Sequence, residues 1–203
     1  MVEIFDSLQG EGYWTGVPIT FVRLAGCNAS ELGLDCLRWC DTPGSWDPGA
    51  GETLSAAAIV ARVHLPRLCL TGGEPLLQPE GVAELVAEAH RCGIRVHLET
   101  NGTVAPPAAE RFDWIAISPK PPGYFIAAEW EGIIDELKLV AGEALDTATA
   151  ERVAAAHPEA IVSVQPLWEG APGGSSETGA VRLVMEHPDW RLSLQTHKYL
   201  GIR

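Results

Sequence analysis

The chain is organised around residues 27–42, which read Cys-Asn-Ala-Ser-Glu-Leu-Gly-Leu-Asp-Cys-Leu-Arg-Trp-Cys-Asp-Thr. This stretch holds three of the five cysteines, Cys27, Cys36 and Cys40. It follows an apolar run at residues 19–24, Ile-Thr-Phe-Val-Arg-Leu, which is typical of a β-strand. A 4Fe-4S cluster is normally held by four cysteines, so three predict a cluster with one iron free to bind a small molecule. The incomplete ligand set therefore indicates a metal centre with an open coordination position.

A structural zinc site is the alternative for these cysteines, with a histidine as the fourth ligand. Zinc loops favour Cys-x2-Cys spacing, whereas the spacing here is Cys-x8-Cys-x3-Cys and no histidine lies nearby in the sequence. A non-catalytic zinc-binding scaffold is therefore the weaker interpretation. Cys69, in a predicted strand, and Cys92, at the end of a predicted helix, are interpreted as small buried residues outside the site.

Composition limits the class of protein. A length of 203 residues predicts a single domain over residues 1–203. The net charge of −13 and the lack of a basic run argue against nucleic-acid binding. We expect no signal peptide, because the N-terminus lacks a charged start followed by an apolar segment. We expect no membrane span, because no apolar run approaches ~18 residues. An odd number of unevenly spaced cysteines fits a reducing compartment, which predicts a cytoplasmic protein.

The chain has only three lysines, which are either solvated charges or residues with specific tasks: Lys120, Lys138 and Lys198.

Strands and helices are expected to alternate along the chain. Strands are predicted at residues 19–24, 67–71, 95–99, 114–117, 136–140, 161–164 and 191–194, and helices at 56–63, 79–90, 147–156 and 178–186. This alternation predicts an α/β fold of right-handed βαβ units around a parallel sheet. A complete (β/α)₈ barrel needs at least about 200 residues. Seven strands with short helices therefore predict an incomplete, partly open (β/α) barrel, whose open side a homodimer would cover.

Polar clusters follow the predicted strands at residues 27–42, 71–75, 99–101, 118–120, 165–166 and 195–198. The carboxyl ends of parallel strands meet at one edge of a sheet, so these clusters should converge. Residues 71–75 read Thr-Gly-Gly-Glu-Pro. The two glycines leave backbone carbonyls open to an ammonium group, and Glu74 adds negative charge. We therefore expect this segment to bind the amino end of an amino-acid derivative, although alone such a segment is more often a turn.

Two further segments contain candidate binding groups. Arg23 lies at the end of the first predicted strand, where it could pair with an anion or form a salt bridge at the rim. Gln9 and Glu11 could bind a flat polar ligand, with Gly10 and Gly12 allowing a close approach of the backbone. A surface turn is the alternative interpretation of residues 7–14.

Together these motifs resemble the radical S-adenosylmethionine superfamily, on Cys27, Cys36, Cys40 and the Thr-Gly-Gly-Glu-Pro segment. More narrowly, the chain resembles the 7-carboxy-7-deazaguanine synthases over residues 8–203. The motifs that carry this resemblance are Leu-Gln-Gly-Glu-Gly (8–12), Phe-Val-Arg-Leu-Ala-Gly-Cys-Asn (21–28), Trp-Cys-Asp-Thr (39–42), Glu-Thr-Asn-Gly (99–102), Ser-Pro-Lys (118–120) and Gln-Thr-His-Lys (195–198). The superfamily usually has Cys-x3-Cys-x2-Cys, so both gaps between the cysteines are longer here. This spacing does not predict the conformation of the loop.

The resemblance implies three cofactors. A 4Fe-4S cluster would be held by Cys27, Cys36 and Cys40, and Mg²⁺ by Thr42. S-adenosylmethionine would be bound by Trp39, Cys40, Asp41, Gly73, Glu74, Ser118, Pro119, Lys120, Gln165, Pro166 and Leu167. A pterin substrate would contact Leu8, Gln9, Gly10, Glu11, Arg23, Thr71, His197, Lys198 and Arg203.

The resemblance also implies a reaction. The family converts 6-carboxy-5,6,7,8-tetrahydropterin into 7-carboxy-7-deazaguanine and ammonia, in the biosynthesis of queuosine and other 7-deazapurines. The reactive species comes from the cofactor, so no catalytic side chain is expected beyond the cofactor-derived radical. An electron donor such as a flavodoxin would be required. The competing interpretation within the superfamily is an activase of a glycyl-radical protein, which would leave residues 9–11 and 197–198 unexplained.

Overall fold

Eight strands form one sheet, in which each strand pairs with its neighbours in sequence, in the order β1-β2-β3-β4-β5-β6-β7-β8. The computed structural model describes residues 1–106, 112–168, 170–171 and 173–203. The strands are β1 (Glu3–Leu8), β2 (Pro18–Leu24), β3 (Arg67–Gly72), β4 (Arg95–Thr100), β5 (Trp114–Ile117), β6 (Glu136–Ala141), β7 (Ile161–Pro166) and β8 (Arg191–Leu192). The helices are α1 (Ala56–Val60), α2 (Pro79–Arg91), α3 (Thr147–Ala155), α4 (Ser175–Glu186) and α5 (Thr196–Leu200).

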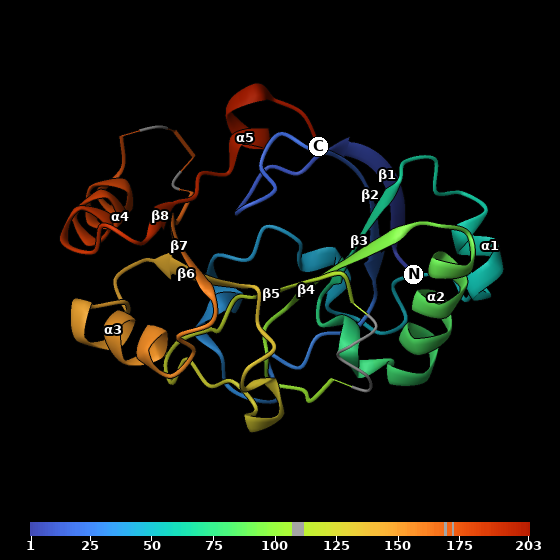
Figure 1. Cartoon of the computed structure of the whole chain (residues 1–203), viewed down its shortest axis with the longest axis horizontal. Helices are drawn as coiled ribbons and strands as arrows, with labels where there is room; N and C mark the ends of the chain where they lie inside the picture. Colours follow the sequence, from blue (N-terminus) through green and yellow to red (C-terminus); the bar gives the residue numbers. More distant parts are fainter. Residues whose placement is uncertain (107–111, 169, 172) are drawn as a thin grey trace.

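The sheet is parallel from β2 to β8. Its two edges, β1 and β8, do not pair with each other in the described part of the chain, so the barrel is not closed. Helices α1 and α2 lie outside one side of the curved sheet, and α3 and α4 outside the other (Figure 1). The α/β fold with an incomplete, partly open barrel, expected from the sequence, is therefore confirmed.

Three elements differ from the sequence-based expectation. Strand β1 was not predicted, and it pairs antiparallel with β2, so the sheet is not wholly parallel. Its sequence, Glu-Ile-Phe-Asp-Ser-Leu, lacks the strict alternation of a half-buried strand, and pairing with β2 supplies its backbone hydrogen bonds. Strand β8 has two residues rather than four. Helix α5 occupies a segment that was interpreted only as a polar cluster.

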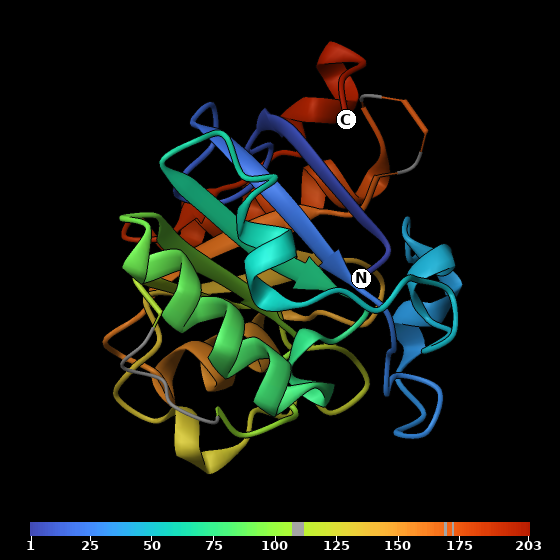
Figure 2. The ribbon, with the colours of Figure 1, turned by 90° about the vertical axis from the view of Figure 1, so that its right-hand side faces the viewer.

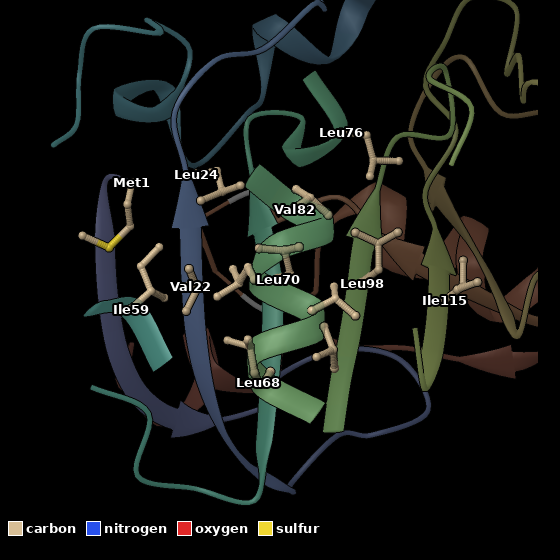
Figure 3. Packing of buried hydrophobic residues seen from close by; sticks show 14 of the residues in the cluster. Met1, Val22, Leu24, Ile59, Leu68, Leu70, Leu76, Val82, Leu98 and Ile115 are labelled. Carbon is tan, nitrogen blue, oxygen red and sulfur yellow. The ribbon is translucent and has the colours of Figure 1, made fainter. Parts of the chain in front are cut away.

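The apolar residues form two clusters, both between the sheet and its helices. In the first, α2 packs Val82, Leu85, Val86 and Ala89 against the outer faces of β2 to β4, as Figure 3 shows for Val82. The second joins β6 and β7 to α3 and α4. These four residues recur at the i, i+3, i+4, i+7 spacing of one helix face, and the helix predicted at residues 79–90 is confirmed. Among the helices of the described residues, none has the length and apolarity needed to cross a bilayer.

Side chains alternate between the two faces of each strand. In β3, Leu68 and Leu70 belong to the outer apolar cluster, so Cys69 and Thr71 face the inside of the sheet. In β4, Val96 and Leu98 likewise leave the inner face to His97 and Glu99. The inner face therefore carries polar groups, which is the condition for a polar site within the open barrel.

The C-terminal segment, residues 195–203, bridges the gap between the two edges of the sheet. It follows β8, and α5 and the chain end lie above the opening in Figure 1. The backbone N–H of Thr196 donates to the carbonyl of Gly10 at 2.8 Å. At the end of the chain, Arg203 pairs with Glu3 on β1, and the Ser7 hydroxyl donates to the Arg203 carbonyl. This segment therefore joins the last strand to the first.

Candidate functional site

A cavity of about 590 Å³ lies inside the open barrel, at the carboxyl ends of the parallel strands. All six polar clusters predicted to converge contribute to its wall. Of the residues implied as site residues by the sequence, all except Glu74 and Pro119 line it. The structure thus brings these side chains together, while their individual roles remain predictions.

The cysteine loop forms one wall of the cavity and contributes Cys27, Cys36 and Cys40. It leaves the end of β2 and runs outward from it, in light blue in Figure 2. Cys36 lies in a short 3-10 turn, Asp35–Arg38, whose first backbone N–H donates to the carbonyl of Pro121 at 3.0 Å. The extended first gap therefore folds as a loop anchored to the segment after β5.

Asn28 fixes the start of this loop. Its amide donates to the Thr103 hydroxyl at 2.8 Å and accepts from the amide of Asn101 at 3.0 Å. Both asparagines are buried. The asparagine beside the first cysteine and the asparagine of the Glu-Thr-Asn-Gly motif thus form one hydrogen-bonded pair, which joins the cysteine loop to the end of β4.

Burial raises the pKa of the Cys27 thiol, and the nearby Glu74 carboxylate and Cys40 sulfur add to this increase. Burial also raises the pKa of Cys36, although the Lys120 ammonium group acts in the opposite direction. Free thiols at this site therefore favour the protonated state, and binding of a metal would release their protons. The Cys40 sulfur contributes to the raised pKa of both Cys27 and Cys36, so it lies near both of them.

The donor set fits an iron–sulfur cluster better than zinc. In the parts of the chain that the structure describes, no three His, Cys, Asp or Glu side chains lie close enough together to hold one metal ion. The three thiolates around a single zinc would lie about 3.8 Å apart, given Zn–S bonds of ~2.3 Å in a tetrahedron. In a 4Fe-4S cluster each cysteine binds a different iron, so the sulfurs lie further apart.

Gly73 allows the cysteine loop to pack against the end of β3. A Cβ atom at Gly73 would lie 2.3 Å from the carbonyl oxygen of Gly26 and 2.7 Å from the Cβ of Cys27. These distances are too short for any side chain. The second glycine of the Thr-Gly-Gly-Glu-Pro segment therefore sets the position of the first cysteine.

Glu74 was expected to place a negative charge at the ligand site, but the structure places it beneath the cavity wall. Its side chain is fully buried and accepts hydrogen bonds from the N–H of Leu76 at 3.1 Å, the hydroxyl of Thr100 at 2.8 Å and the N–H of Asn101 at 2.8 Å. Burial raises the pKa of Glu74, against the effect of these donors. Glu74 therefore ties the end of β3 to the end of β4.

Pro119 is buried and does not line the cavity, whereas its neighbours Ser118 and Lys120 do. The Lys120 ammonium group donates to the Ser118 hydroxyl at 2.7 Å and lies 5.5 Å from the centre of the Trp39 ring. Burial lowers the pKa of Lys120. All three lysines of the chain line this cavity, which favours specific tasks for them over the interpretation as solvated charges.

A buried ion cluster forms another wall of the cavity. The Lys138 ammonium group, 7% exposed, lies 3.0 Å from Glu11 Oε2 and 3.1 Å from Glu99 Oε1. Gln9 donates to Glu99 Oε1 at 3.0 Å and Gln195 donates to Glu11 Oε1 at 2.7 Å. Two carboxylates and one ammonium group leave one net negative charge beside the cavity.

The pKa values in this ion cluster follow from the pairing. Burial alone would raise the pKa of Glu11, but Lys138 and Gln195 outweigh it and lower the pKa to about 2. Burial also opposes ionisation of Glu99, yet Lys138 lowers its pKa overall. Burial would lower the pKa of Lys138, whereas Glu99 and Glu11 raise it well above its usual value. All three groups are therefore charged at neutral pH.

The sequence placed residues 99–101 in a polar cluster expected to converge on the site and left a specific task open for Lys138, but it predicted no binding role for Glu99 or Lys138. Glu99 precedes the Thr-Asn-Gly turn on the inner face of β4, and Lys138 is a charged residue within the apolar run of β6. A charge in an otherwise apolar strand, next to a predicted site, was the signal that could have identified them.

Several residues implied as substrate contacts are paired with other protein groups. Lys198 lies 2.7 Å from Asp41 on the cysteine loop, and Arg23 lies 2.8 Å from Glu3. Gly10 is required here, because a Cβ at this position would lie 2.0 Å from Nδ1 of His197. The rim salt bridge considered for Arg23 is thus present, and Arg23 also lines the cavity.

A comparison with protein-family models finds no match. Three relatives, each named 7-carboxy-7-deazaguanine synthase, come from Methanospirillum hungatei JF-1, Synechocystis sp. and Bordetella pertussis. Each is 35% identical to this chain; the alignments cover 100%, 100% and 98% of the chain and 85%, 93% and 97% of the relatives. The crystal structure of QueE from Escherichia coli is similar with a TM-score of 0.72 and 26% identity, over 97% of this chain and 93% of that one.

Replacing Lys138 by methionine should destabilise the fold by about 3 kcal/mol at pH 7, because it leaves two carboxylates without their cation. The pH dependence should also change sign. The wild type loses stability as pH falls below 4.5 toward about 2, where Glu11 protonates. The variant should become more stable as pH falls from about 7 to 5, because burial then raises both carboxyl pKa values. Urea unfolding at several pH values measures this, and parallel profiles for the two proteins would contradict it.

Replacing Gly73 by alanine should destabilise the protein by about 1–3 kcal/mol and reduce iron uptake, because the new methyl group displaces Cys27. Gly81→Ala is the matched control: no atom lies within 4 Å of a Cβ there, and the residue lies inside α2. The control should be stabilised by up to about 1 kcal/mol. Thermal unfolding and iron content measure both effects. Equal iron uptake by the two variants would show that Gly73 does not set the position of Cys27.

Proposed function

Because the chain belongs to the family of 7-carboxy-7-deazaguanine synthases, we propose that its cavity is the site at which 6-carboxy-5,6,7,8-tetrahydropterin is bound and converted. The protein is a radical S-adenosylmethionine enzyme of the queuosine pathway, and its product is 7-carboxy-7-deazaguanine, formed with loss of ammonia. One observation supports this assignment: a single cavity combines a cysteine wall with a buried ion cluster. Three cysteines lie on one wall, and a cluster of two carboxylates and one lysine lies on another.

We propose that Cys27, Cys36 and Cys40 hold a 4Fe-4S cluster. With S-adenosylmethionine bound, the cluster supplies one-electron chemistry that gives a radical able to take a hydrogen atom from the substrate. Trp39, Lys120 and the backbone at Gly73 would hold the cofactor. The remaining cofactor contacts would come from Ser118 and from residues 165–167, which line the cavity at the end of β7.

The ion cluster is proposed to bind the amino-pyrimidine edge of the pterin. This edge offers N–H donors, and carboxylates are the matching acceptors. We add Glu99 to Glu11 as a substrate contact. Glu99 Oε1 already accepts from Lys138 and Gln9, whereas Oε2 has one long contact, 3.5 Å to the Thr71 hydroxyl. Oε2 is therefore the acceptor atom with capacity for a ligand.

The opposite end of the pterin carries a carboxylate, and cationic groups should hold it. Arg23, His197, Lys198 and Arg203 line the same cavity. We propose that the Thr42 hydroxyl would help to hold Mg²⁺, which would neutralise this carboxylate, since Mg²⁺ prefers oxygen ligands and keeps several waters. Asp41 pairs with Lys198 across the cavity mouth, so the substrate carboxylate would have to share Lys198 with Asp41.

The competing functions lack this support. An activase of a glycyl-radical protein acts on a polypeptide and has no need for a cavity with a carboxylate pair on its wall. A zinc scaffold would require thiolates grouped more tightly than those of the described residues. Both alternatives therefore rank below the synthase.

We further propose that residues 1–203 form a single domain, which the one continuous sheet supports. A homodimer is proposed because large apolar side chains are exposed around α4, α5 and β8: Val181, Met185, Leu192, Leu200 and Ile202. All five cysteines are free, which fits a reducing cytoplasm. Electrons would come from a donor protein such as a flavodoxin. Sedimentation at micromolar concentration tests the dimer, and a monomer would contradict it.

Anaerobic reconstitution with iron and sulfide tests the function. The wild type should become brown and, with S-adenosylmethionine, Mg²⁺ and a reductant, convert the carboxytetrahydropterin into the deazaguanine. Cys36→Ala should lose both iron and turnover. Cys92, which the sequence predicted to be buried, is exposed at the end of α2 and lies outside the cavity. Cys92→Ala is therefore the matched control, and it should keep both. Full turnover by Cys36→Ala would overturn the ligand assignment, and a colourless wild type containing one zinc would favour the scaffold.

Thr42→Ala should weaken the stimulation of turnover by Mg²⁺ while leaving the iron content unchanged. Thr42 lines the cavity, and it is not one of the three residues proposed to bind the cluster. The exposed Thr53 offers the matched control, Thr53→Ala, which should respond to Mg²⁺ as the wild type does. A Mg²⁺ titration of the turnover rate measures both variants. An unchanged response in Thr42→Ala would show that another group binds the ion.

A further inference from the structure

Trp46 contacts two of the three cysteines. Its backbone carbonyl accepts a hydrogen bond from the N–H of Cys27 at 3.2 Å. Its indole Nε1–H donates to the sulfur of Cys40 at 3.3 Å. The residue is half-buried and lines the cavity. Trp46 therefore connects the beginning and the end of the cysteine loop, although it lies outside every motif identified in the sequence.

A short hydrogen-bonded turn fixes the backbone that carries the Trp46 indole. Residues Pro43–Ser45 form a 3-10 turn, and the N–H of Trp46 donates to the Pro43 carbonyl at 3.2 Å. The buried Ser45 donates its hydroxyl to the Thr42 carbonyl at 2.8 Å, and its own carbonyl accepts from the N–H of Gly26 at 2.8 Å. The donor is thus preorganised toward Cys40.

The sulfur of Cys40 has two polar side-chain neighbours within the described residues: the Trp46 indole and the Thr42 hydroxyl, the latter at 3.6 Å. The hydroxyl can donate or accept, and it is the group proposed above to bind Mg²⁺. The indole nitrogen is a donor only and does not titrate. Trp46 therefore donates a side-chain N–H to a cysteine sulfur of the site. Because the indole does not titrate, it remains a donor to that sulfur at every pH.

We propose that Trp46 tunes the metal centre: its indole N–H, hydrogen-bonded to the Cys40 sulfur, makes the cluster easier to reduce. Reduction adds one electron, taken from the external donor, and part of the added negative charge falls on the cysteine sulfurs. A hydrogen-bond donor stabilises that charge more in the reduced state than in the oxidised state. The inference rests on the proposed function, because it requires a cluster on Cys27, Cys36 and Cys40.

Trp46→Phe removes the N–H and keeps an aromatic ring. At a fixed solution potential, the ratio of reduced to oxidised cluster should fall on the order of tenfold, as expected for loss of a hydrogen bond to a charged acceptor. For a one-electron couple this corresponds to a shift of about 59 mV to more negative potential. An anaerobic redox titration, followed by the electron paramagnetic resonance signal of the reduced cluster without substrate, measures the shift.

Trp190→Phe is the matched control, because Trp190 stacks on His187 and packs in the second apolar cluster, away from the cysteine loop. Its cluster should titrate as the wild-type cluster does. If Trp46→Phe binds a full complement of iron and keeps the wild-type potential, the proposal is overturned. If it folds but takes up less iron, Trp46 shapes the loop rather than tuning the cluster, which also overturns the proposal.

A second measurement covers a Trp46→Phe chain that does not fold. Incorporation of 5-fluorotryptophan leaves the sequence unchanged and makes each indole N–H a stronger donor, because fluorine withdraws electron density. The potential of the labelled cluster should rise, and an unchanged potential would count against the proposal. A wild type that assembles no cluster at all would instead remove the proposed function.

Discussion

The site depends on a buried ammonium group held between two carboxylates. Lys138 on β6 pairs with Glu99 on β4 and with Glu11 in the loop between β1 and β2. Gln195 extends the contact from Glu11 to the C-terminal segment. An unpaired charge in this environment would be costly, so each member holds the others in place. The same ion pairs that join distant parts of the chain also present charged acceptors to the cavity.

The segments around the cysteine loop divide into residues that face the cavity and residues that hold the loop. Glu74 is buried beneath the wall and binds neighbouring backbone and side chains, while Thr71 and Gly73 reach the cavity wall. A short motif at a strand end therefore serves two purposes. Half of it fixes the path of the chain, and the other half forms the surface that a ligand would meet.

Much of the fold could be predicted from local sequence. Strands β2 to β7 are short segments rich in apolar residues, and α2 shows its buried face in its spacing, so both are visible without knowledge of contacts. Strand β1 and helix α5 are not. One is an edge strand supported by β2, and the other is a five-residue helix docked on the backbone of Gly10. Such short elements gain their stability from packing rather than from propensity.

The sequence by itself determined the incomplete cysteine set, the parallel sheet and the convergence of the polar segments. Strand periodicity is visible in the local sequence. The carboxyl ends of parallel strands lie at the same edge of a sheet, so the segments that follow them meet there. Only the tertiary structure decided that Glu74 is turned away from the cavity, that Glu99 faces it, and that Trp46 reaches the sulfur of Cys40. It also decided the partners of Lys138, which include a residue 127 positions away in the chain. These outcomes depend on which side chains the folded backbone brings within a few ångströms of one another, and no spacing along the sequence encodes that distance.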